Sequence, residues 1–427
     1  MEQTSHSRGG QAPAFDAPPA GSHAPAALPW SGLLTLTLAV FVVVSGEMMP
    51  TAVLPVLAAD LDVSVAQAGL LVSAWAATVV VASFPLARLT ARFDRSTVIA
   101  VALVVFSGAT LATAWAGTYG LAMGSRLVAA AATGLLWSTV NTYAASIVPE
   151  HRIARATAIV LFGGTLGTVA AVPAGNAAAA LWGWRVPFVV LALLGLATAL
   201  AVHVVLRRTR VVDVSAPGTP GTGSTVVAPR RQLRPVFVIG ALGGLILVAH
   251  FAAFTFVAEL VLPSAVPTPA LLLVFGLVSA SGVVLVGATS DRFPSGTPVV
   301  MAAVVAVSLI GLVLLGRHGG VDIGLVVLWG VATGAVGPAV QVAMMRAAGP
   351  EHRSTAGTLM PVAMNLGIAV GAALGSGVVD RWSVEVLPVV AAVPAVFATV
   401  GFLAVARATR LSRAPGPILG PTATHEP

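Results

Sequence analysis

Twelve long apolar stretches divide this sequence, and they constrain its fold more than any other feature does. Each has about the 20 residues that an α-helix needs to cross the hydrocarbon core of a bilayer. Only helices and closed barrels satisfy their backbone polar groups in that core. We therefore predict an all-α integral membrane protein with twelve transmembrane helices. The predicted spans are 30–57, 67–87, 97–117, 119–147, 154–181, 185–206, 236–262, 270–290, 297–316, 321–347, 355–379 and 384–406.

The composition is that of a membrane protein and not of a soluble one. Hydrophobic residues make up 57% of the chain and charged residues only 9%, whereas soluble domains carry about 25% charged residues. The formal net charge is +7, but the arginines lie between apolar stretches and do not gather on one polar face. This pattern predicts a lipid bilayer as partner and no nucleic acid. Because the chain has no cysteine, disulfides and thiolate metal sites are excluded.

A basic segment at 207–235 separates two parts of similar length. It contains six arginines, four prolines and three glycines, which is typical of a flexible linker. Motifs of the first part recur in the second at a shift of 200 or 201: 91–93 with 291–293, 149–152 with 350–353, and 166–167 with 366–367. We therefore predict two pseudo-symmetric six-helix halves. The predicted boundaries are a tail at 1–29, a first half at 30–206, the linker at 207–235, a second half at 236–407 and a tail at 408–427.

The arginines also predict the orientation in the membrane. With the N-terminus inside, eighteen arginines fall in cytoplasmic segments and only Arg185, Arg317 and Arg381 fall outside. Cytoplasmic loops carry an excess of basic residues, so we expect both termini and the linker in the cytoplasm. Both tails are expected to be disordered. The complete absence of lysine favours a GC-rich bacterial genome, and hence the bacterial inner membrane.

Several motifs carry a family resemblance. The loop after the second span reads Ala-Arg-Leu-Thr-Ala-Arg-Phe-Asp-Arg at 87–95, and the loop after the eighth reads Gly-Ala-Thr-Ser-Asp-Arg at 287–292. Gly-Glu-Met-Met-Pro at 46–50, the run ending in Trp at 68–75 and Asn-Leu-Gly at 365–367 are further motifs. With them, residues 30–406 resemble the major facilitator superfamily, in particular the arabinose-efflux-permease-like branch of its twelve-span drug:proton antiporters.

This resemblance implies a gate at the cytoplasmic ends of the two halves. The implied gate residues are Arg88, Arg92, Asp94, Arg95, Asp291 and Arg292. Ala91 stands where the family has an acid, which leaves open which carboxylate serves the gate. The alternative is that these arginines only set the topology.

The fifth span carries small residues spaced by four. Gly163, Gly167 and Gly175, together with Pro173, resemble the Gly/Pro motif of the superfamily's exporting antiporters, although Ala171 departs from it. Such spacing places small residues on one helix face, where a neighbouring helix can approach closely. General helix packing is the alternative explanation.

Very few ionisable residues lie deep within the predicted spans. Glu47 lies ~14 Å below the outer end of the first span, and Arg126 lies ~11 Å from the same side on the fourth. A carboxylate and a cation at one depth predict a proton-coupling site, with a structural ion pair as the alternative. His250, in the middle of the seventh span, is either a second proton-coupling residue or a hydrogen-bonding cavity residue. We expect Glu259 to face the outer vestibule.

Polar and aromatic side chains within the spans are candidates for the substrate cavity, although each could instead be satisfied between helices. They are Thr51, Trp75, Trp137, Asn141, Tyr143, Thr255, Gln341 and Asn365.

No enzyme pattern is present in the sequence. There is no lysine for a Walker motif, and no cluster suggests a metal or a catalytic triad. We predict a monomeric secondary active transporter without a cofactor other than the proton as coupling ion. Its function would be proton-coupled efflux of a small organic molecule (a drug, sugar or secondary metabolite) by alternating access. The alternatives are a metabolite importer, as symporter or facilitator, and a non-transporting receptor or scaffold on the same fold.

Overall fold

The computed structural model describes residues 28–149, 152–207, 230–289 and 292–411, which form helices and no strand. These helices contain twelve stretches long and apolar enough to cross a membrane, so the predicted fold class is confirmed. The helices are α1 (Trp30–Asp60), α2 (Val65–Thr90), α3 (Arg95–Ala114), α4 (Tyr119–Ser146), α5 (Ile153–Trp182), α6 (Arg185–Leu206), α7 (Arg230–Phe254), α8 (Val257–Leu260), α9 (Thr268–Thr289), α10 (Gly296–Gly311), α11 (Gly319–Arg381) and α12 (Leu387–Leu411).

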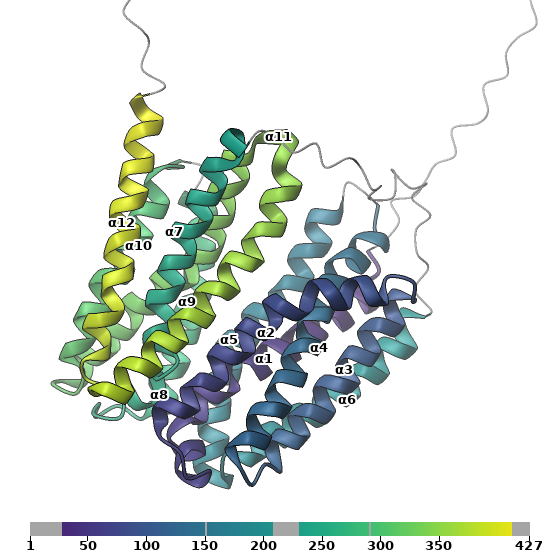
Figure 1. Cartoon of the computed structure of the whole chain (residues 1–427), viewed down its shortest axis with the longest axis horizontal. Coiled ribbons are helices and arrows are strands. Elements are labelled where there is room, and N and C mark those ends of the chain that lie inside the picture. Colours follow the sequence, from purple (N-terminus) through teal and green to yellow (C-terminus); the bar gives the residue numbers. More distant parts are fainter. Residues whose placement is uncertain (1–27, 150–151, 208–229, 290–291, 412–427) are drawn as a thin grey trace, which may run out of the picture.

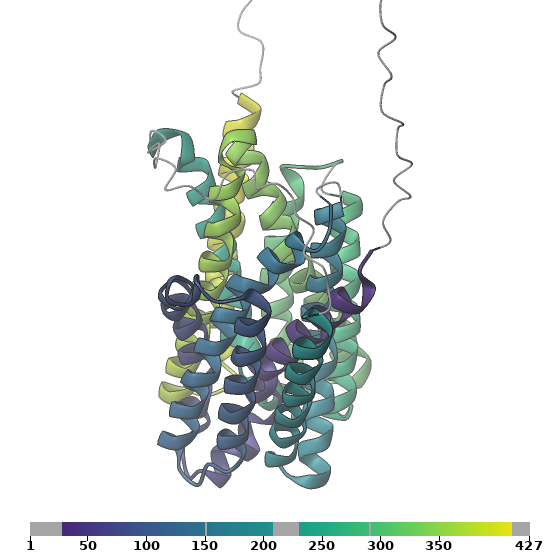
Figure 2. The ribbon, with the colours of Figure 1, turned by 90° about the vertical axis from the view of Figure 1, so that its right-hand side faces the viewer.

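The helices form two bundles that follow the order of the chain (Figure 1). In the first, which we call the N-half, α1 packs against α5 and α6, while α3 packs against α4 and α6. In the second, the C-half, α7 packs against α11 and α12, while α10 packs against α12. Figure 2 shows from the side that the helices of both bundles run in broadly the same direction. Most of the predicted linker and both predicted tails lie outside the described residues.

The two halves meet mainly at one end of the molecule. We call the end where α1 begins and α12 finishes the termini end, and the opposite end, with the α1–α2 junction, the far end. The ribbons of the halves are close at the far end and diverge toward the termini end (Figure 1). Contacts between the halves are made by α2 with α11, by α5 with α9 and by α1 with α8. A hydrogen bond between described residues crosses this boundary, from Ser73 Oγ to the Ala369 carbonyl at 2.7 Å.

In each half, an aspartate at the far end links two segments of the chain. In the N-half, Asp60 forms a 2.7 Å ion pair with Arg185, which joins the end of α1 to the start of α6. In the C-half, Asp322 is fully buried and accepts hydrogen bonds from the Ser264 hydroxyl and, at 3.0 Å, from the Gly316 N–H. Asp322 is a buried carboxylate that the sequence analysis did not single out. It holds the loop before α9 and the turn before α11 together.

The seventh span ends earlier than the apolar pattern predicts. We predicted 236–262, but α7 stops at Phe254 and the short helix α8 follows. The Thr255 hydroxyl donates to the Phe251 carbonyl at 2.6 Å, and the Phe256 N–H bonds to Ala253, three residues back. These bonds compete with the regular helical pattern and tighten the last turn. Neither glycine nor proline marks the break, so hydropathy alone did not reveal it.

The tenth and eleventh spans are joined in the long element α11. Its helical conformation is interrupted at Gly349, which has φ 65° and ψ −179°. This left-handed φ favours glycine because a Cβ there would be strained. On either side lie the spans Gly319–Gly349 and Leu359–Arg381, close to those predicted.

Candidate functional site

The centre of the N-half is built around a backbone defect in α1. Pro50 has no N–H, so the carbonyl of Gly46, four residues earlier, lacks its helical donor. The Arg126 side chain on α4 supplies the missing hydrogen bond, from Nη1 to the Gly46 carbonyl at 2.7 Å. A longer bond of 3.4 Å runs from Nη2 to the Glu47 carbonyl. A proline in one helix is therefore compensated by an arginine from another, as membrane-embedded backbone requires.

Aromatic rings surround the Arg126 guanidinium. Its Cζ lies 4.0 Å from the centroid of the Trp75 ring of α2, a cation–π contact, and Arg126 is only 1% exposed. Trp75 in turn packs edge-on against Phe106 of α3 at 6.4 Å. Gly46 is required at its position because a Cβ would lie 2.5 Å from Phe106 Cζ. The site thus joins α1, α2, α3 and α4.

Glu47 lies beside this cation without forming an ion pair with it. Its side chain is 9% exposed. Among the described residues, no ion pair or hydrogen bond is made to its carboxylate, because the guanidinium bonds to the main chain. The structure therefore brings Glu47 and Arg126 together, as their depths suggested, but not as the ion pair that was the alternative.

A second cluster occupies the C-half, around His250. Its imidazole stacks on Phe254 at 5.0 Å and Phe275 at 6.2 Å, and contacts Phe251 and Trp329 at 4.9 and 5.5 Å. His250 Nδ1 and Trp329 Nε1 are buried without a hydrogen-bond partner among the described residues. Buried polar atoms of this kind are rare and call for an explanation. The sequence analysis missed Phe275 and Trp329, although Phe275 stands 200 residues after Trp75, which is the repeat shift.

The other predicted cavity residues fall into three groups, which are buried, exposed or partly buried. Thr51, Tyr143 and Thr255 are buried, with their hydroxyls donating to the carbonyls of Met48, Leu206 and Phe251 at 2.6, 3.1 and 2.6 Å. In this conformation they are satisfied between or within helices. Asn141 and Gln341, also related by the repeat shift, are exposed near the termini end of their helices.

Two remaining cavity candidates are only partly buried. Trp137 lies on α4, and Asn365 of α11 donates through Nδ2 to the Pro361 carbonyl at 3.1 Å. That carbonyl belongs to the same helix, so this bond does not link Asn365 to another helix.

The predicted gate arginines are exposed at the termini end, and three of them lie over phenylalanine rings. Arg88 stacks on Phe84, Arg92 on Phe93 and Arg292 on Phe293, at 5.6, 5.4 and 5.7 Å. Arg95, also exposed, begins α3. Asp291 lies outside the described residues.

Asp94, the other predicted gate acid, caps the start of α3. Its carboxylate accepts hydrogen bonds from the Ser96 hydroxyl and, at 2.9 Å, from the Thr97 N–H. The bond from Ser96, followed by that from the Thr97 backbone, holds the pKa of Asp94 below its usual range. In this structure Asp94 therefore acts on its own helix, as N-caps do.

The glycines of α5 lie against neighbouring helices. A Cβ at Gly163 would meet the Thr37 carbonyl of α1 at 2.0 Å, and one at Gly167 would meet the Phe41 carbonyl at 3.0 Å. Gly175 packs on Met49 Sδ, at 2.6 Å from its Cβ position. These close approaches are what the four-residue spacing permits.

Pro173 of α5 has a different effect, because it frees a carbonyl at the boundary between the halves. It leaves the Val169 carbonyl without a helical donor. A Cβ at Gly276 of α9, in the other half, would lie 2.5 Å from that oxygen. Only glycine therefore lets the two halves approach so closely here.

No group of three or more His, Cys, Asp or Glu side chains that could hold a metal ion occurs within the described ranges. The twelve spans in two halves, with a carboxylate and an arginine buried at the centre of the N-half, define a class: polytopic helical transporters of small molecules. The sequence profile of the Major Facilitator Superfamily matches residues 36–360. The chain belongs to this family, and its members are transporters and not enzymes.

Similar proteins agree with this assignment. A chloramphenicol efflux pump of Mycobacterium tuberculosis is 30% identical over 379 residues, covering 85% of this chain and 90% of that protein. The inner membrane transport protein YdhP of Escherichia coli is 30% identical over 355 residues, covering 82% and 88%.

Solved structures agree on the fold. The chain is similar to a bacterial homologue of the human lysosomal transporter Spinster, solved in an inward-facing and unoccupied conformation, with a TM-score of 0.74 at 17% identity and coverage of 92% and 100%. A peptide transporter, POT, in complex with sulfate gives a TM-score of 0.72 at 14% identity, with coverage of 90% and 95%.

Proposed function

We propose that this transporter exports a small organic molecule from the cell in exchange for protons. The observation that carries the proposal is Glu47: a buried carboxylate beside a buried cation that is bound to the main chain. Such a carboxylate changes charge without breaking an ion pair, which suits a proton carrier better than a structural role. His250 is the second candidate, because its Nδ1 is buried and unpartnered within the described part of the chain.

Arg126 would act by setting the electrostatic environment of Glu47. Its charge favours the ionised carboxylate, whereas burial favours the protonated one. Access of protons to Glu47 from one side of the membrane or the other would then decide whether its carboxylate is ionised or protonated. Proton binding and substrate binding would be mutually unfavourable, and the two halves would rock about the central site. The substrate would bind between them, with Trp137, Asn141, Gln341 and Asn365 as the candidates nearest the diverging ends.

The orientation follows from the charge asymmetry. Eighteen arginines against three support an orientation with the termini end in the cytoplasm and the far end outside, in the plasma membrane of a bacterium. The divergence of the halves at the termini end then corresponds to a conformation open to the cytoplasm (Figure 1). We propose that the transporter works as a monomer, since one chain contains both halves.

Chloramphenicol is the first substrate to test, because two relatives are named as pumps for it. Everted membrane vesicles expose the cytoplasmic side, so an exporter should accumulate labelled chloramphenicol inside them when the lumen is made acidic. Collapse of the pH gradient should stop accumulation. An importer coupled to protons would instead accumulate its substrate in right-side-out vesicles with acid outside.

Glu47→Gln tests the mechanism in the same vesicles. We expect it to abolish accumulation against a gradient, because an amide neither takes up nor releases a proton, while leaving downhill exchange of labelled for unlabelled compound. Glu385→Gln, which removes an exposed carboxylate, is the matched control and should transport normally. Accumulation by Glu47→Gln at the wild-type rate would assign the proton to another residue, His250 being the next to test.

A further inference from the structure

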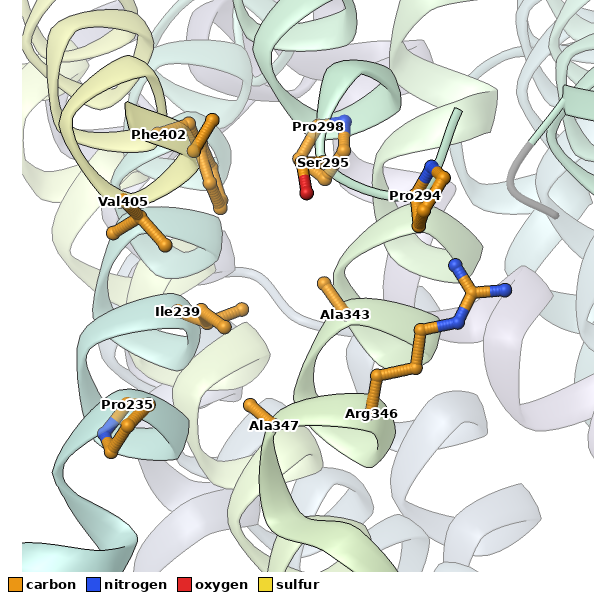
Figure 3. A pocket seen from close by; sticks show the side chains of 11 residues that line it. Pro235, Ile239, Pro294, Ser295, Pro298, Ala343, Arg346, Ala347, Phe402 and Val405 are labelled. Atoms are coloured by element: carbon orange, nitrogen blue, oxygen red, sulfur yellow. The ribbon is translucent and has the colours of Figure 1, made fainter. Parts of the chain in front are cut away.

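A separate pocket lies at the termini end of the C-half, away from the central site. It has a volume of about 320 Å³ and is bounded by α7, α10, α11 and α12 (Figure 3). Its lining residues are Pro235, Ile239, Pro294, Ser295, Pro298, Ala343, Arg346, Ala347, Phe402, Val405 and Ala406. Figure 3 shows the Arg346 side chain extending along the wall toward Pro294, with Ile239 and Val405 opposite.

The pocket is amphipathic from its rim to its floor. Pro235, Pro294 and Arg346 are exposed, whereas Ile239 and Phe402 are only 7% and 3% exposed. Among the described residues that line it, Arg346 and Ser295 carry the polar side chains. A ligand with an anionic group at the mouth and apolar atoms beneath matches this lining.

The position of the pocket matches the boundary between lipid and water. The spans that border it run from Leu233 on α7, from Gly296 on α10, to Gly349 on α11 and to Ala408 on α12. All its lining residues lie within about two turns of these ends. This is the depth of phospholipid headgroups, where a helix end meets the interface.

Charge and surface character agree with a lipid ligand. The neighbouring chain carries Arg234 next to Pro235 and Arg407 next to Ala406, both exposed. On α12, Val396, Phe397 and Val400 are 45%, 66% and 60% exposed, as expected for a face in contact with acyl chains. Basic pockets between transmembrane helices are suited to anionic headgroups.

We propose that this pocket binds an anionic phospholipid, with its phosphate at Arg346 and its glycerol and upper acyl chain against Ile239 and Phe402. The apolar floor argues against free phosphate, which would leave these residues facing water or an ion. The site is specific to the C-half, because the N-half has Ala145 and Ser146 at the positions equivalent to Arg346.

The test measures lipid binding to the full chain, purified in detergent and delipidated. Phosphatidylglycerol, phosphatidylcholine and inorganic phosphate are titrated separately, and bound lipid is counted by native mass spectrometry while the unfolding temperature is followed. Wild type should bind phosphatidylglycerol in preference to phosphatidylcholine and show no response to phosphate. Arg346→Gln should weaken phosphatidylglycerol binding about fivefold, the factor for one arginine near an anionic headgroup.

Two further variants separate this effect from misfolding. Ala343→Leu keeps the arginine but fills the pocket, and it should also weaken binding of phosphatidylglycerol. Arg317→Gln removes an exposed arginine at the far end and should bind as wild type does. Equal binding of both lipids, an unchanged affinity in Arg346→Gln, or an Arg346-dependent response to phosphate alone would overturn the proposal. Binding that appears only after deletion of 412–427 would make the chain's own tail the occupant.

Discussion

The role of Arg126 depends on two residues that are four apart in α1. Pro50 removes a backbone donor, and Gly46 presents the carbonyl that has lost it. The guanidinium donates to this carbonyl and stacks on Trp75, so these contacts position it without a bond to the Glu47 carboxylate. On the mechanism we propose, the cation would therefore stay in place when Glu47 takes up or releases a proton.

Arg126→Ala should destabilise the protein mainly by leaving the Gly46 carbonyl unsatisfied. A hydrogen bond to a charged group contributes about 2 kcal/mol, so a clear fall in the unfolding temperature is expected in detergent. Pro50→Ala restores a backbone N–H for that carbonyl. The double variant Arg126→Ala with Pro50→Ala should therefore recover more stability than Arg126→Ala with Glu47→Gln.

The comparison of these two double variants distinguishes the two causes. Better recovery with Glu47→Gln would mean that the uncompensated carboxylate, and not the carbonyl, is the main cost of losing Arg126. Pro50→Ala alone is the control for any effect of straightening α1.

Glu259 offers a pH-dependent test at the far end. Its Oε2 is buried without a partner among the described residues. Burial, followed by the negative charge of Glu385, raises the pKa of Glu259 above its ordinary value of 4.5. A raised carboxyl pKa gives stability that is present below pH 4.5 and is lost as the pH rises through the folded-state pKa.

Glu259→Gln should therefore gain stability relative to wild type as the pH rises from 4 to 8. The measurement is the difference in unfolding temperature between the two proteins at each pH. Glu385→Gln removes the repelling charge and should make the wild-type pH dependence weaker. A difference that stays constant over this range would show that the carboxyl of Glu259 is not perturbed.

At the residue scale, counting along the helices was enough to bring Glu47 and Arg126 together. Hydropathy and depth gave no information on which atom the guanidinium binds. That depends on the i to i−4 relation between Gly46 and Pro50, which is readable in the sequence. The His250 cluster required the tertiary contacts of α7, α9 and α11, since aromatic residues in apolar spans do not stand out by composition.

At the scale of helices, contacts between the halves depend on glycine. A Cβ at Gly69 of α2 would lie 2.5 Å from Phe256 Cζ and 2.7 Å from Ser376 Oγ, both in the C-half. The Phe256 ring is fully buried between this glycine and Gly375 of α11, whose Cβ position is 3.0 Å from the ring. The ring therefore fits only while both positions lack side chains.

Gly69→Ala should push the halves apart at the far end and shift the molecule toward a conformation open there. The chain has no cysteine, so spin labels on Trp115→Cys and Trp382→Cys report this directly. Both tryptophans are exposed at the far end, one in each half. We expect a larger share of long distances in the Gly69→Ala background.

Gly108→Ala is the matched control, because a Cβ there meets nothing within 4 Å. Its distance distribution should equal that of the parent. Identical distributions in Gly69→Ala would mean that Phe256 or Ser376 moves aside and that this contact does not hold the halves together.

Among the helices, apolar length predicted number and approximate position well. The predicted span boundaries are wrong where the helix is interrupted although no polar residues mark the interruption in the sequence. Thr255 and Phe256 end α7 within an apolar run, and Gly349 interrupts α11 without a long loop. Local backbone bonding decides both, and a hydropathy window averages over such details.

For the whole molecule, the fold class and the family could be predicted from the sequence. The motifs of the first half recur in the second, and the few charged residues lie at regular places between the apolar spans. The side of the membrane on which the termini lie is still a prediction from arginine counting. A reporter fused after Arg208 should be cytoplasmic, and one inserted at Gly319 should be external, since basic segments stay inside. An external signal from the reporter at Arg208 would reverse the orientation and the direction of transport.

The contacts of Asp60 and Asp322 at the far end determine how the opening of that end responds to ionic strength. Asp60 bonds within the N-half and Asp322 within the C-half, and no described ion pair crosses between them. Separation of the halves at that end breaks apolar and backbone contacts but separates no opposite charges. Salt weakens exposed charge pairs but has little effect on such contacts. Opening at the far end should therefore proceed at the same rate in dilute buffer and at high ionic strength.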